Sequence, residues 1–350
     1  MSIRIGEVSI GNDEPTFVIA EAGCNHNGSI DIAKQLVDSA VKSGAHAVKF
    51  QTYASELMYS KQTPMMSHFK ERMNLGEDAT MFDLIQATEL PLEHHEPIVG
   101  YCREKSIPFF STPFDLGSVE FLSQFDPPAY KIASFEMTHF PLLERVGATG
   151  RPVILSTGMS NLGDIEKALI QLDKVGSDEV ILLHCVSNYP AQPEDYNLRV
   201  IETLKRAFGF PVGISDHTPG IETALVAVAA GADIVEKHIT VDQQLPGPDH
   251  HFSLTPEQLQ DLVAGVKRVD LMLGAPYKRC TPSEREMREI GRRSLMAAKD
   301  IRKGEVISHE MLAVKRPGTG LHPQYADVLL GAIAKVDITS DSPLTWKMFL

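Results

Sequence analysis

The sequence predicts an α/β protein, a TIM-type (β/α)₈ barrel followed by a small, mostly-β module. Eight short apolar, β-branched runs recur along the chain, and a helical pattern follows each of them. Near-continuous apolar runs of this length are typical of parallel strands covered on both faces. After residue 273 the alternation stops, and prolines and charged residues precede a short, turn-rich tail.

The eight apolar runs are the expected strands, in chain order. They cover residues 17–22, 47–51, 108–112, 129–134, 153–157, 180–184, 212–215 and 234–238. The segment after the first run places Leu36, Val37 and Ala40 on one helical face and ends at Gly44. Helical patterns also follow later runs, at residues 165–172, 218–229 and 255–266.

These elements predict the domain organisation. We expect a barrel domain over residues 1–273, a linker over 274–290 and the tail module over 291–350. Residues 53–80 are too many for a simple connection, so we expect an insertion over one face of the barrel.

Composition narrows the function classes. The chain has 33 Lys and Arg against 46 Asp and Glu, a formal charge of −13, which argues against nucleic acid or an anionic membrane as a partner. Its four cysteines are scattered without a CxxC pair, which fits a reducing cytoplasm. No secretory or membrane-spanning apolar run is present in the sequence, so we expect a cytoplasmic location.

Two lysines interrupt otherwise apolar strands. Strand alternation points Lys49 and Lys131 away from their apolar neighbours and into the barrel, where an ammonium group is costly without an anion. Several predicted strand ends also carry hydroxyls, namely Ser111, Thr112, Ser134, Ser156, Thr157 and Ser215. Singly, such hydroxyls cap helices and such lysines are snorkelling or paired, but together they predict a pocket for a phosphate dianion.

Two histidines end neighbouring strands. His217 and His238 should therefore lie close together, and imidazole pairs are good ligands for divalent cations. A structural metal takes four ligands, so two imply an open, Lewis-acid site acting on a carbonyl. The alternative is a pair of hydrogen-bonded core histidines. Glu21 and Glu236 border the same region and are candidates for proton handling.

An ordered set of motifs resembles the sialic acid synthase family. These are EAGCNHNG (21–28), AVKFQT (47–52), STPFD (111–115), KIAS-E (131–136), LSTGM (155–159), HCVSNYPA (184–191), GISDHT (213–218), EKHIT (236–240) and PGPDH (246–250). In the tail, KRPGTGL (315–321) resembles the antifreeze-like, β-clip SAF domain of those enzymes.

This resemblance implies a transferase that condenses phosphoenolpyruvate with the open-chain aldehyde of an N-acetylated amino sugar. The acceptor would be N-acetylmannosamine or a 2,4-diacetamido-6-deoxy analogue. The products would be a nonulosonic acid, of the N-acetylneuraminate or legionaminate type, and phosphate released by C–O cleavage. A divalent cation, Mn²⁺ or Mg²⁺, would be held by His217 and His238. A homodimer would place the tail module of one subunit over the active site of the other.

The resemblance also assigns roles to residues. Phosphoenolpyruvate would be held by Lys49, Thr112, Lys131, Ser134, Ser156, Ser215 and Ser187, where some members carry Asn in place of this last serine. The sugar or metal-bound water would contact Glu21, Gln51, Tyr189 and Asp249. Glu136 and Glu236 would handle the attacking water or a proton, and Arg316 would reach the N-acetyl end of the sugar.

Three alternatives stay open on the sequence. One is a pseudaminic acid synthase, which shares these motifs. Another is a phosphoenolpyruvate-dependent aldolase that makes 3-deoxy-keto acids from phosphorylated sugars and would need a second cationic cluster. The third is a protein that binds a saccharide or ice without turnover.

Overall fold

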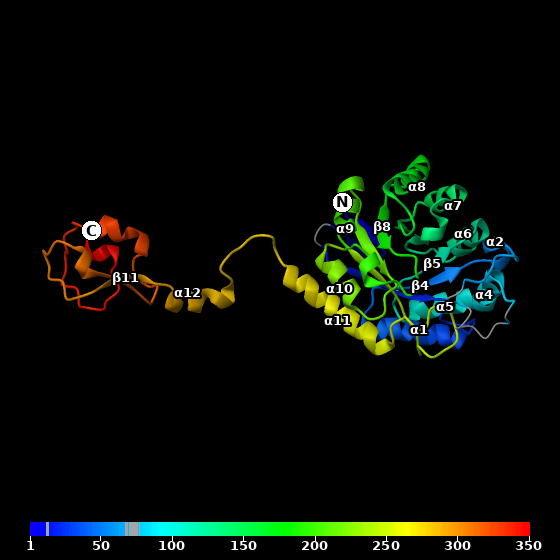
Figure 1. Cartoon of the computed structure of the whole chain (residues 1–350), viewed down its shortest axis with the longest axis horizontal. Coiled ribbons are helices and arrows are strands. Elements are labelled where there is room, and N and C mark those ends of the chain that lie inside the picture. The colour runs from blue at the N-terminus through cyan, green and yellow to red at the C-terminus, as the bar shows by residue number, and fades with distance from the viewer. Residues whose placement is uncertain (12–13, 67–68, 70–75, 77) are drawn as a thin grey trace. The chain divides into compact units, whose positions relative to one another are not determined.

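The computed structural model describes residues 1–11, 14–66, 69, 76 and 78–350, and the chain divides into two compact units (Figure 1). The units are Met1–Gly274 and Ala275–Leu350. In the first, eight parallel strands follow the order β5-β4-β3-β10-β9-β8-β7-β6, and the outer two of these lie against each other. The sheet therefore closes into the predicted TIM barrel.

The barrel strands match the expected runs. Their bounds are β3 Phe17–Gly23, β4 Ala47–Thr52, β5 Phe109–Pro113, β6 Tyr130–Ile132, β7 Val153–Ser156, β8 Val180–Cys185, β9 Val212–Asp216 and β10 Ile234–His238. The expected extent of the fourth strand, residues 129–134, is wrong. β6 has only three residues, because the chain turns directly into a 3₁₀ helix, η1 (Ser134–Glu136).

Helices alternate with these strands. They are α1 Ile30–Ser43, α5 Leu92–Glu104, α6 Leu116–Ser123, α7 Phe140–Gly147, α8 Leu162–Lys174, α9 Val200–Phe208, α10 Glu222–Ala229 and α11 Pro256–Leu273. The expected helix start at residue 218 is wrong, and α10 begins at Glu222. Asp216 Oδ1 accepts hydrogen bonds from the backbone N–H and the hydroxyl of Thr218, which favours a turn there over a helix.

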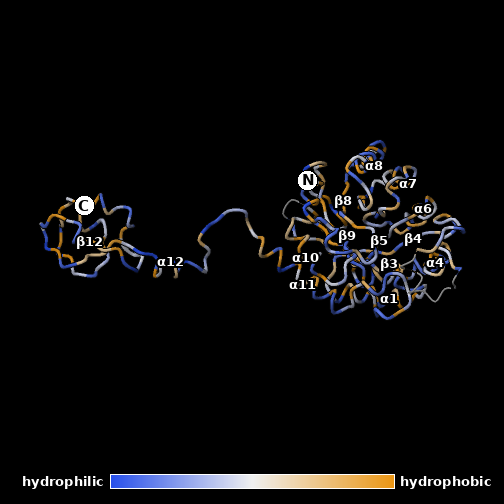
Figure 2. The backbone as a smooth tube through the Cα atoms, viewed as in Figure 1, coloured by the Kyte–Doolittle hydropathy of each residue, from blue (hydrophilic) through white to orange (hydrophobic). Residues whose placement is uncertain are grey.

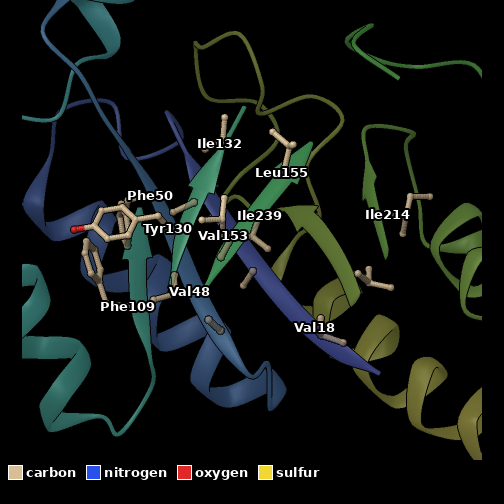
Figure 3. Packing of buried hydrophobic residues seen from close by; sticks show 14 of the residues in the cluster. Val18, Val48, Phe50, Phe109, Tyr130, Ile132, Val153, Leu155, Ile214 and Ile239 are labelled. Carbon is tan, nitrogen blue, oxygen red and sulfur yellow. The ribbon is translucent and has the colours of Figure 1, made fainter. Parts of the chain in front are cut away.

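Alternation along the strands separates two apolar layers. Outward-facing residues such as Val18, Val48 and Val153 pack against the helices (Figure 3). Hydrophobic residues, orange in Figure 2, run along the strands. Inward-facing residues near the strand starts pack with an N-terminal hairpin of β1 (Ile3–Ile5) and β2 (Val8–Ile10). This plug fills the amino-terminal end of the barrel and leaves polar inward residues at the carboxyl ends of the strands.

The segment between β4 and α5 holds two short helices, α2 (Ser55–Met58) and α4 (Met81–Thr88). Met65, Phe69, Met81 and Leu84 form a small apolar cluster there. Of the insertion expected over residues 53–80, residues 67–68, 70–75 and 77 lie outside the described residues.

The second unit is the small module expected from the tail. Strands β11 (Ser294–Ala297) and β12 (Leu312–Lys315) pair antiparallel over a core that includes Leu295, Ile307 and Leu344. The segment expected to be a linker contains a helix, α12 (Arg285–Gly291). Within the described parts of both units, no helix is long and apolar enough to cross a membrane.

Candidate active site

The carboxyl ends of the barrel strands surround one pocket of about 240 Å³. It gathers all the predicted site residues except Glu136 of η1 and Arg316 of the tail module. The predicted residues that line it are Glu21, Lys49, Gln51, Thr112, Lys131, Ser134, Ser156, Ser187, Tyr189, Ser215, His217, Glu236, His238 and Asp249. The structure thus brings together side chains that lie more than two hundred positions apart in the sequence.

Two predicted site residues are placed elsewhere. Glu136 does not appear among the described residues of the pocket, and its Oε2 lies 3.2 Å from His139 Nδ1. Because β6 is short and η1 turns the chain, Ser134 lines the pocket and Glu136 does not. Arg316 belongs to the second unit, where its Nε donates to the carbonyl of Gly291 at 2.6 Å.

The two lysines share a buried cluster with two carboxylates. Lys49 Nζ lies 2.8 Å from Glu21 Oε2 and 3.7 Å from Glu236 Oε2, and it donates to Thr112 Oγ1 at 2.9 Å. Lys131 Nζ lies 3.6 Å from Glu236 Oε1. The sequence argument assigned the balancing anion to a substrate, whereas Glu21 and Glu236 already supply two negative charges. Binding of a substrate anion therefore requires that one of these carboxylates lose its charge or its contact with the lysines.

The two carboxylates of the cluster titrate differently. Burial, reinforced by the charge of Glu236, raises the pKa of Glu21 to about 7 against the opposing effect of Lys49. The pKa of Glu236 lies below its usual value, because Lys131, Lys49 and the Ser215 hydroxyl outweigh burial. Separated pKa values of this kind identify acid and base partners. Glu236 stays ionised at neutral pH, and Glu21 can gain or lose a proton there.

Hydroxyl groups form a cradle around Gly158, a residue that the sequence reasoning missed. The Gly158 N–H donates to Ser134 Oγ at 2.9 Å, and a Cβ at this position would lie 2.8 Å from that oxygen and collide with Ser187 Oγ. Ser156 Oγ and Ser187 Oγ are buried without a hydrogen-bond partner among the described residues. Unpartnered hydroxyls beside two ammonium groups suit phosphate oxygens. The LSTGM motif held the signal, but only coordinates show the close approach.

The two predicted metal-binding histidines are neighbours, with ring centroids 5.4 Å apart. His217 Nδ1 donates to the carbonyl of Val186 at 2.9 Å, and Nε2 lies 3.5 Å from Ser215 Oγ. Burial lowers the pKa of His217, but the Cys185 thiol and the Val186 carbonyl outweigh it, so this pKa lies above its usual value. His238 Nδ1 has no hydrogen-bond partner among the described residues and lies 3.6 Å from Asp249 Oδ2. Burial, then the charge of His217 and nearby lysines, holds the pKa of His238 well below its usual value, which keeps it neutral.

These donors fit an open cation site and not a closed one. Among the described residues no group of three or more His, Cys, Asp or Glu side chains is arranged to hold a metal ion. A cation held by His217 and His238 would therefore complete its coordination with water or substrate. Gly23, at a φ of +50°, leaves room for this arrangement, because a Cβ there would lie 3.1 Å from His238 Nδ1.

The outer wall of the pocket is apolar and comes largely from the segment between β4 and α5. It is lined by Met58, Tyr59, Met66, Phe69, Met81, Leu84, Ile85, Phe114, Phe135 and Met159. Side-chain periodicity does not distinguish a packed methionine from one that faces a cavity.

Comparison with protein families identifies the chain. The model of the NeuB family matches residues 36–278, and that of the SAF domain matches residues 292–350. The chain belongs to the NeuB family. The resemblance inferred from the motifs is thereby confirmed, and this family condenses phosphoenolpyruvate with amino sugars.

Relatives with named activities are similar over almost the whole chain. The N,N'-diacetyllegionaminic acid synthase of Campylobacter jejuni is 39% identical, with 93% of this chain and 98% of that protein covered. The pseudaminic acid synthase of Helicobacter pylori is 34% identical, with 95% and 97% covered. A crystal structure of the N-acetylneuraminic acid synthetase of Leptospira borgpetersenii superposes with a TM-score of 0.72 at 38% identity, covering 82% of this chain and 95% of that one.

The hydroxyl cradle predicts a specific effect of Gly158→Ala. The added methyl group would displace the Ser134 and Ser187 hydroxyls, so the Michaelis constant for phosphoenolpyruvate should rise at least ~10-fold. The measurement is phosphate release as a function of phosphoenolpyruvate concentration. Gly100→Ala is the matched control, because a Cβ at that position in α5 meets nothing within 4 Å. An unchanged constant in Gly158→Ala would show that these hydroxyls do not contact the substrate.

The raised pKa of Glu21 predicts a pH-dependent effect of Glu21→Gln on stability. The folded protein binds a proton at Glu21 that the unfolded chain loses near pH 4.5, so this stabilising contribution disappears as pH rises through about 7. The melting temperature of Glu21→Gln, relative to that of the unsubstituted protein, should therefore increase between pH 5 and pH 8. The corresponding change in the difference between their unfolding free energies is at most about 3 kcal/mol.

Glu21→Gln must be compared with the unsubstituted protein because buried histidines change the stability of both with pH in the direction opposite to Glu21. His238 and His250 have lowered pKa values, so their effect on stability grows with pH, but both proteins share it. Calorimetry of both proteins at several pH values checks the prediction. A difference in melting temperature that does not change with pH would mean that Glu21 is ionised throughout.

Proposed function

We propose that this chain is a nonulosonic acid synthase that condenses phosphoenolpyruvate with the open-chain aldehyde of an unphosphorylated N-acetylated amino sugar. This would be a transferase reaction that releases phosphate by C–O cleavage. The observation that carries the proposal is the buried pair Lys49 and Lys131 beside unpartnered hydroxyls and two neighbouring histidines, all in one pocket. Membership of the NeuB family supports it.

The ammonium and hydroxyl groups would hold the donor. Lys49, Lys131 and the cradle hydroxyls would bind the phosphate and carboxylate of phosphoenolpyruvate. Carbon 3 of the donor adds to the aldehyde carbon, water adds to carbon 2, and the bond from carbon 2 to the phosphate oxygen breaks. A phosphate ion leaves and a keto group remains.

Glu21 is the group best suited to move a proton in this sequence. Its pKa of about 7 allows it to accept a proton from the attacking water at neutral pH and to return one later. Gln51 Nε2 donates to Glu21 Oε1 at 3.0 Å and keeps the other carboxylate oxygen toward Lys49. Glu236 stays ionised and holds both ammonium groups at the edge of the cradle.

A divalent cation, Mn²⁺ or Mg²⁺, held by His217 and His238 would supply Lewis-acid polarisation of the acceptor carbonyl. Three features support this part of the proposal. They are Nε2 of His217, which the Ser215 hydroxyl contacts at 3.5 Å, the unpartnered Nδ1 of His238 and the nearby Asp249 carboxylate, all donor types that such ions take.

The pocket favours an acceptor without a phosphate group. The only lysines or arginines among its described lining residues are Lys49 and Lys131, and both are engaged by carboxylates. The apolar outer wall suits methyl groups, which a 2,4-diacetamido-6-deoxy hexose carries in its two N-acetyl groups and at carbon 6. The higher identity to the legionaminic acid synthase than to the pseudaminic acid synthase agrees with this choice.

We further propose a cytoplasmic homodimer in which the SAF module of one subunit covers the barrel mouth of the other. Exposed apolar side chains on the module, Val306, Val328 and Ile333, are typical of a surface that is covered by a partner. Arg316 would then serve the partner's pocket. The four cysteines are unpaired, which agrees with a reducing compartment.

The proposed reaction is tested by mixing the protein with phosphoenolpyruvate, Mn²⁺ and a panel of acceptors while phosphate release is followed. The 2,4-diacetamido-6-deoxy hexose of manno configuration should give the highest kcat/KM, N-acetylmannosamine a lower one, and arabinose 5-phosphate none. Absence of phosphate release with every N-acetylated hexose would overturn the proposed function. Preference for arabinose 5-phosphate would favour the aldolase alternative.

Removal of divalent cations predicts a loss of activity that depends on the histidine pair. Chelation with EDTA should lower phosphate release at least ~100-fold, and added Mn²⁺ should restore it. In His217→Ala and His238→Ala, Mn²⁺ should fail to restore it, because one of the two imidazole donors is missing. His309→Ala, an exposed histidine of the second unit, is the control. Full activity in the presence of EDTA would exclude a role for the cation.

A further inference from the structure

Tyr196 is a fully buried residue that no motif singles out and that does not line the described pocket. It lies at the end of the short 3₁₀ helix η2 (Pro193–Asp195), between β8 and α9. Its hydroxyl donates to the carbonyl of Ser215 at 3.0 Å and accepts from the backbone N–H of His217 at 2.7 Å. One phenol group therefore binds the main chain on both sides of Asp216.

The position of this hydroxyl meets a need of the backbone. Pairing between β9 and β10 ends at Asp216, so the buried N–H of His217 has no partner within the sheet. A buried N–H without an acceptor is costly, and a phenol oxygen can accept one hydrogen bond while donating another. Burial raises the pKa of the Tyr196 phenol well above its usual value, so the proton that it donates stays in place.

The segment that carries Tyr196 also holds the rest of His217. The Val186 carbonyl accepts from His217 Nδ1 at 2.9 Å, and the Ala191 N–H donates to the His217 carbonyl at 3.1 Å. Tyr196 itself is fixed by His184, whose Nε2 contacts the Tyr196 carbonyl and whose ring packs edge-on against the phenol. The ring Nδ1, the N–H and the carbonyl of His217 thus each have a hydrogen-bond partner in residues 186–196, and Ser215 Oγ contacts Nε2 from within β9 at 3.5 Å.

We propose that Tyr196 is a positioning residue for the cation site: its hydroxyl fixes the backbone of Ser215 and of His217, and thereby the direction of the His217 Nε2 atom. The inference rests on the proposed function, because it takes His217 as a cation ligand. Residues that orient a metal-binding histidine typically change metal affinity 10- to 100-fold when they are substituted. The donor phosphate, held mainly by the lysines and the hydroxyl cradle, should be affected much less.

The test is Tyr196→Phe in the full chain, which removes one oxygen and keeps the buried ring. The dissociation constant of Mn²⁺, measured by electron paramagnetic resonance without substrates, should rise ~10- to 100-fold. Phosphoenolpyruvate affinity in EDTA should change less than ~3-fold. High Mn²⁺ concentrations should recover most of the phosphate-release rate. Tyr101→Phe, which removes a surface hydroxyl bound to Asp38, is the matched control and should leave both affinities unchanged.

The outcomes separate this inference from the proposed function. A lower melting temperature with unchanged Mn²⁺ affinity in Tyr196→Phe would reduce Tyr196 to a structural residue and overturn the inference alone. Failure of the unsubstituted protein to bind Mn²⁺ would instead overturn the proposed cation site, and the inference with it. If Tyr196→Phe does not fold, p-aminophenylalanine at position 196 keeps the donor to Ser215 but accepts poorly. This variant should bind Mn²⁺ with an affinity between that of the unsubstituted protein and that expected for Tyr196→Phe. An affinity equal to that of the unsubstituted protein would overturn the inference.

Discussion

The site depends on a buried cluster of two ammonium groups and two carboxylates, to which water has little access. One of the carboxylates, Glu21, is only partly ionised at neutral pH. Each ion alone would be costly at this depth, and the cluster is tolerable because neighbouring strands place opposite charges in contact. Glu21 and Lys49 are register partners on β3 and β4, and Glu236 reaches both Lys49 and Lys131 from β10. Closure of the barrel brings β10 opposite β6 and so makes the second contact possible. The fold is thus a condition for the charge balance, and the charge balance a condition for binding an anion.

The neutral form of Glu21 explains how such a balanced cluster can still take up a substrate anion. With Glu21 ionised, two positive and two negative charges cancel and the pocket has little attraction for phosphate. When Glu21 gains a proton, one ammonium charge becomes available to the donor. A carboxyl with a pKa of about 7 makes this exchange nearly free at neutral pH. Glu21 then holds a proton while the donor enters, and it must give up that proton before it can accept one from the attacking water.

Sequence reasoning located most of this site because it follows from strand alternation. The position of Lys49 between apolar neighbours, and of His217 and His238 at successive strand ends, was sufficient to place these side chains at one end of a barrel. Glu136 does not line the described pocket, because β6 has only three residues, a length that depends on tertiary packing and that periodicity does not report. Gly158 and Tyr196 were missed for a related reason. Their importance lies in close approaches between loops, and the distances involved are not encoded in spacing along the chain.

Alternation also explains how β9 and β10 present the histidines without losing their own alignment. Ser215 and Glu236 face the pocket and hydrogen-bond there, while the next residues, Asp216 and Lys237, form a fully buried ion pair at 2.7 Å on the opposite face. This pair ties the two strands together one residue before each histidine. From the β8 side, residues 186–196 hold His217 while Ser187 and Tyr189 of the same segment line the pocket. The donor cradle and the proposed cation site thus share one supporting loop, and a displacement of that loop would move both at once.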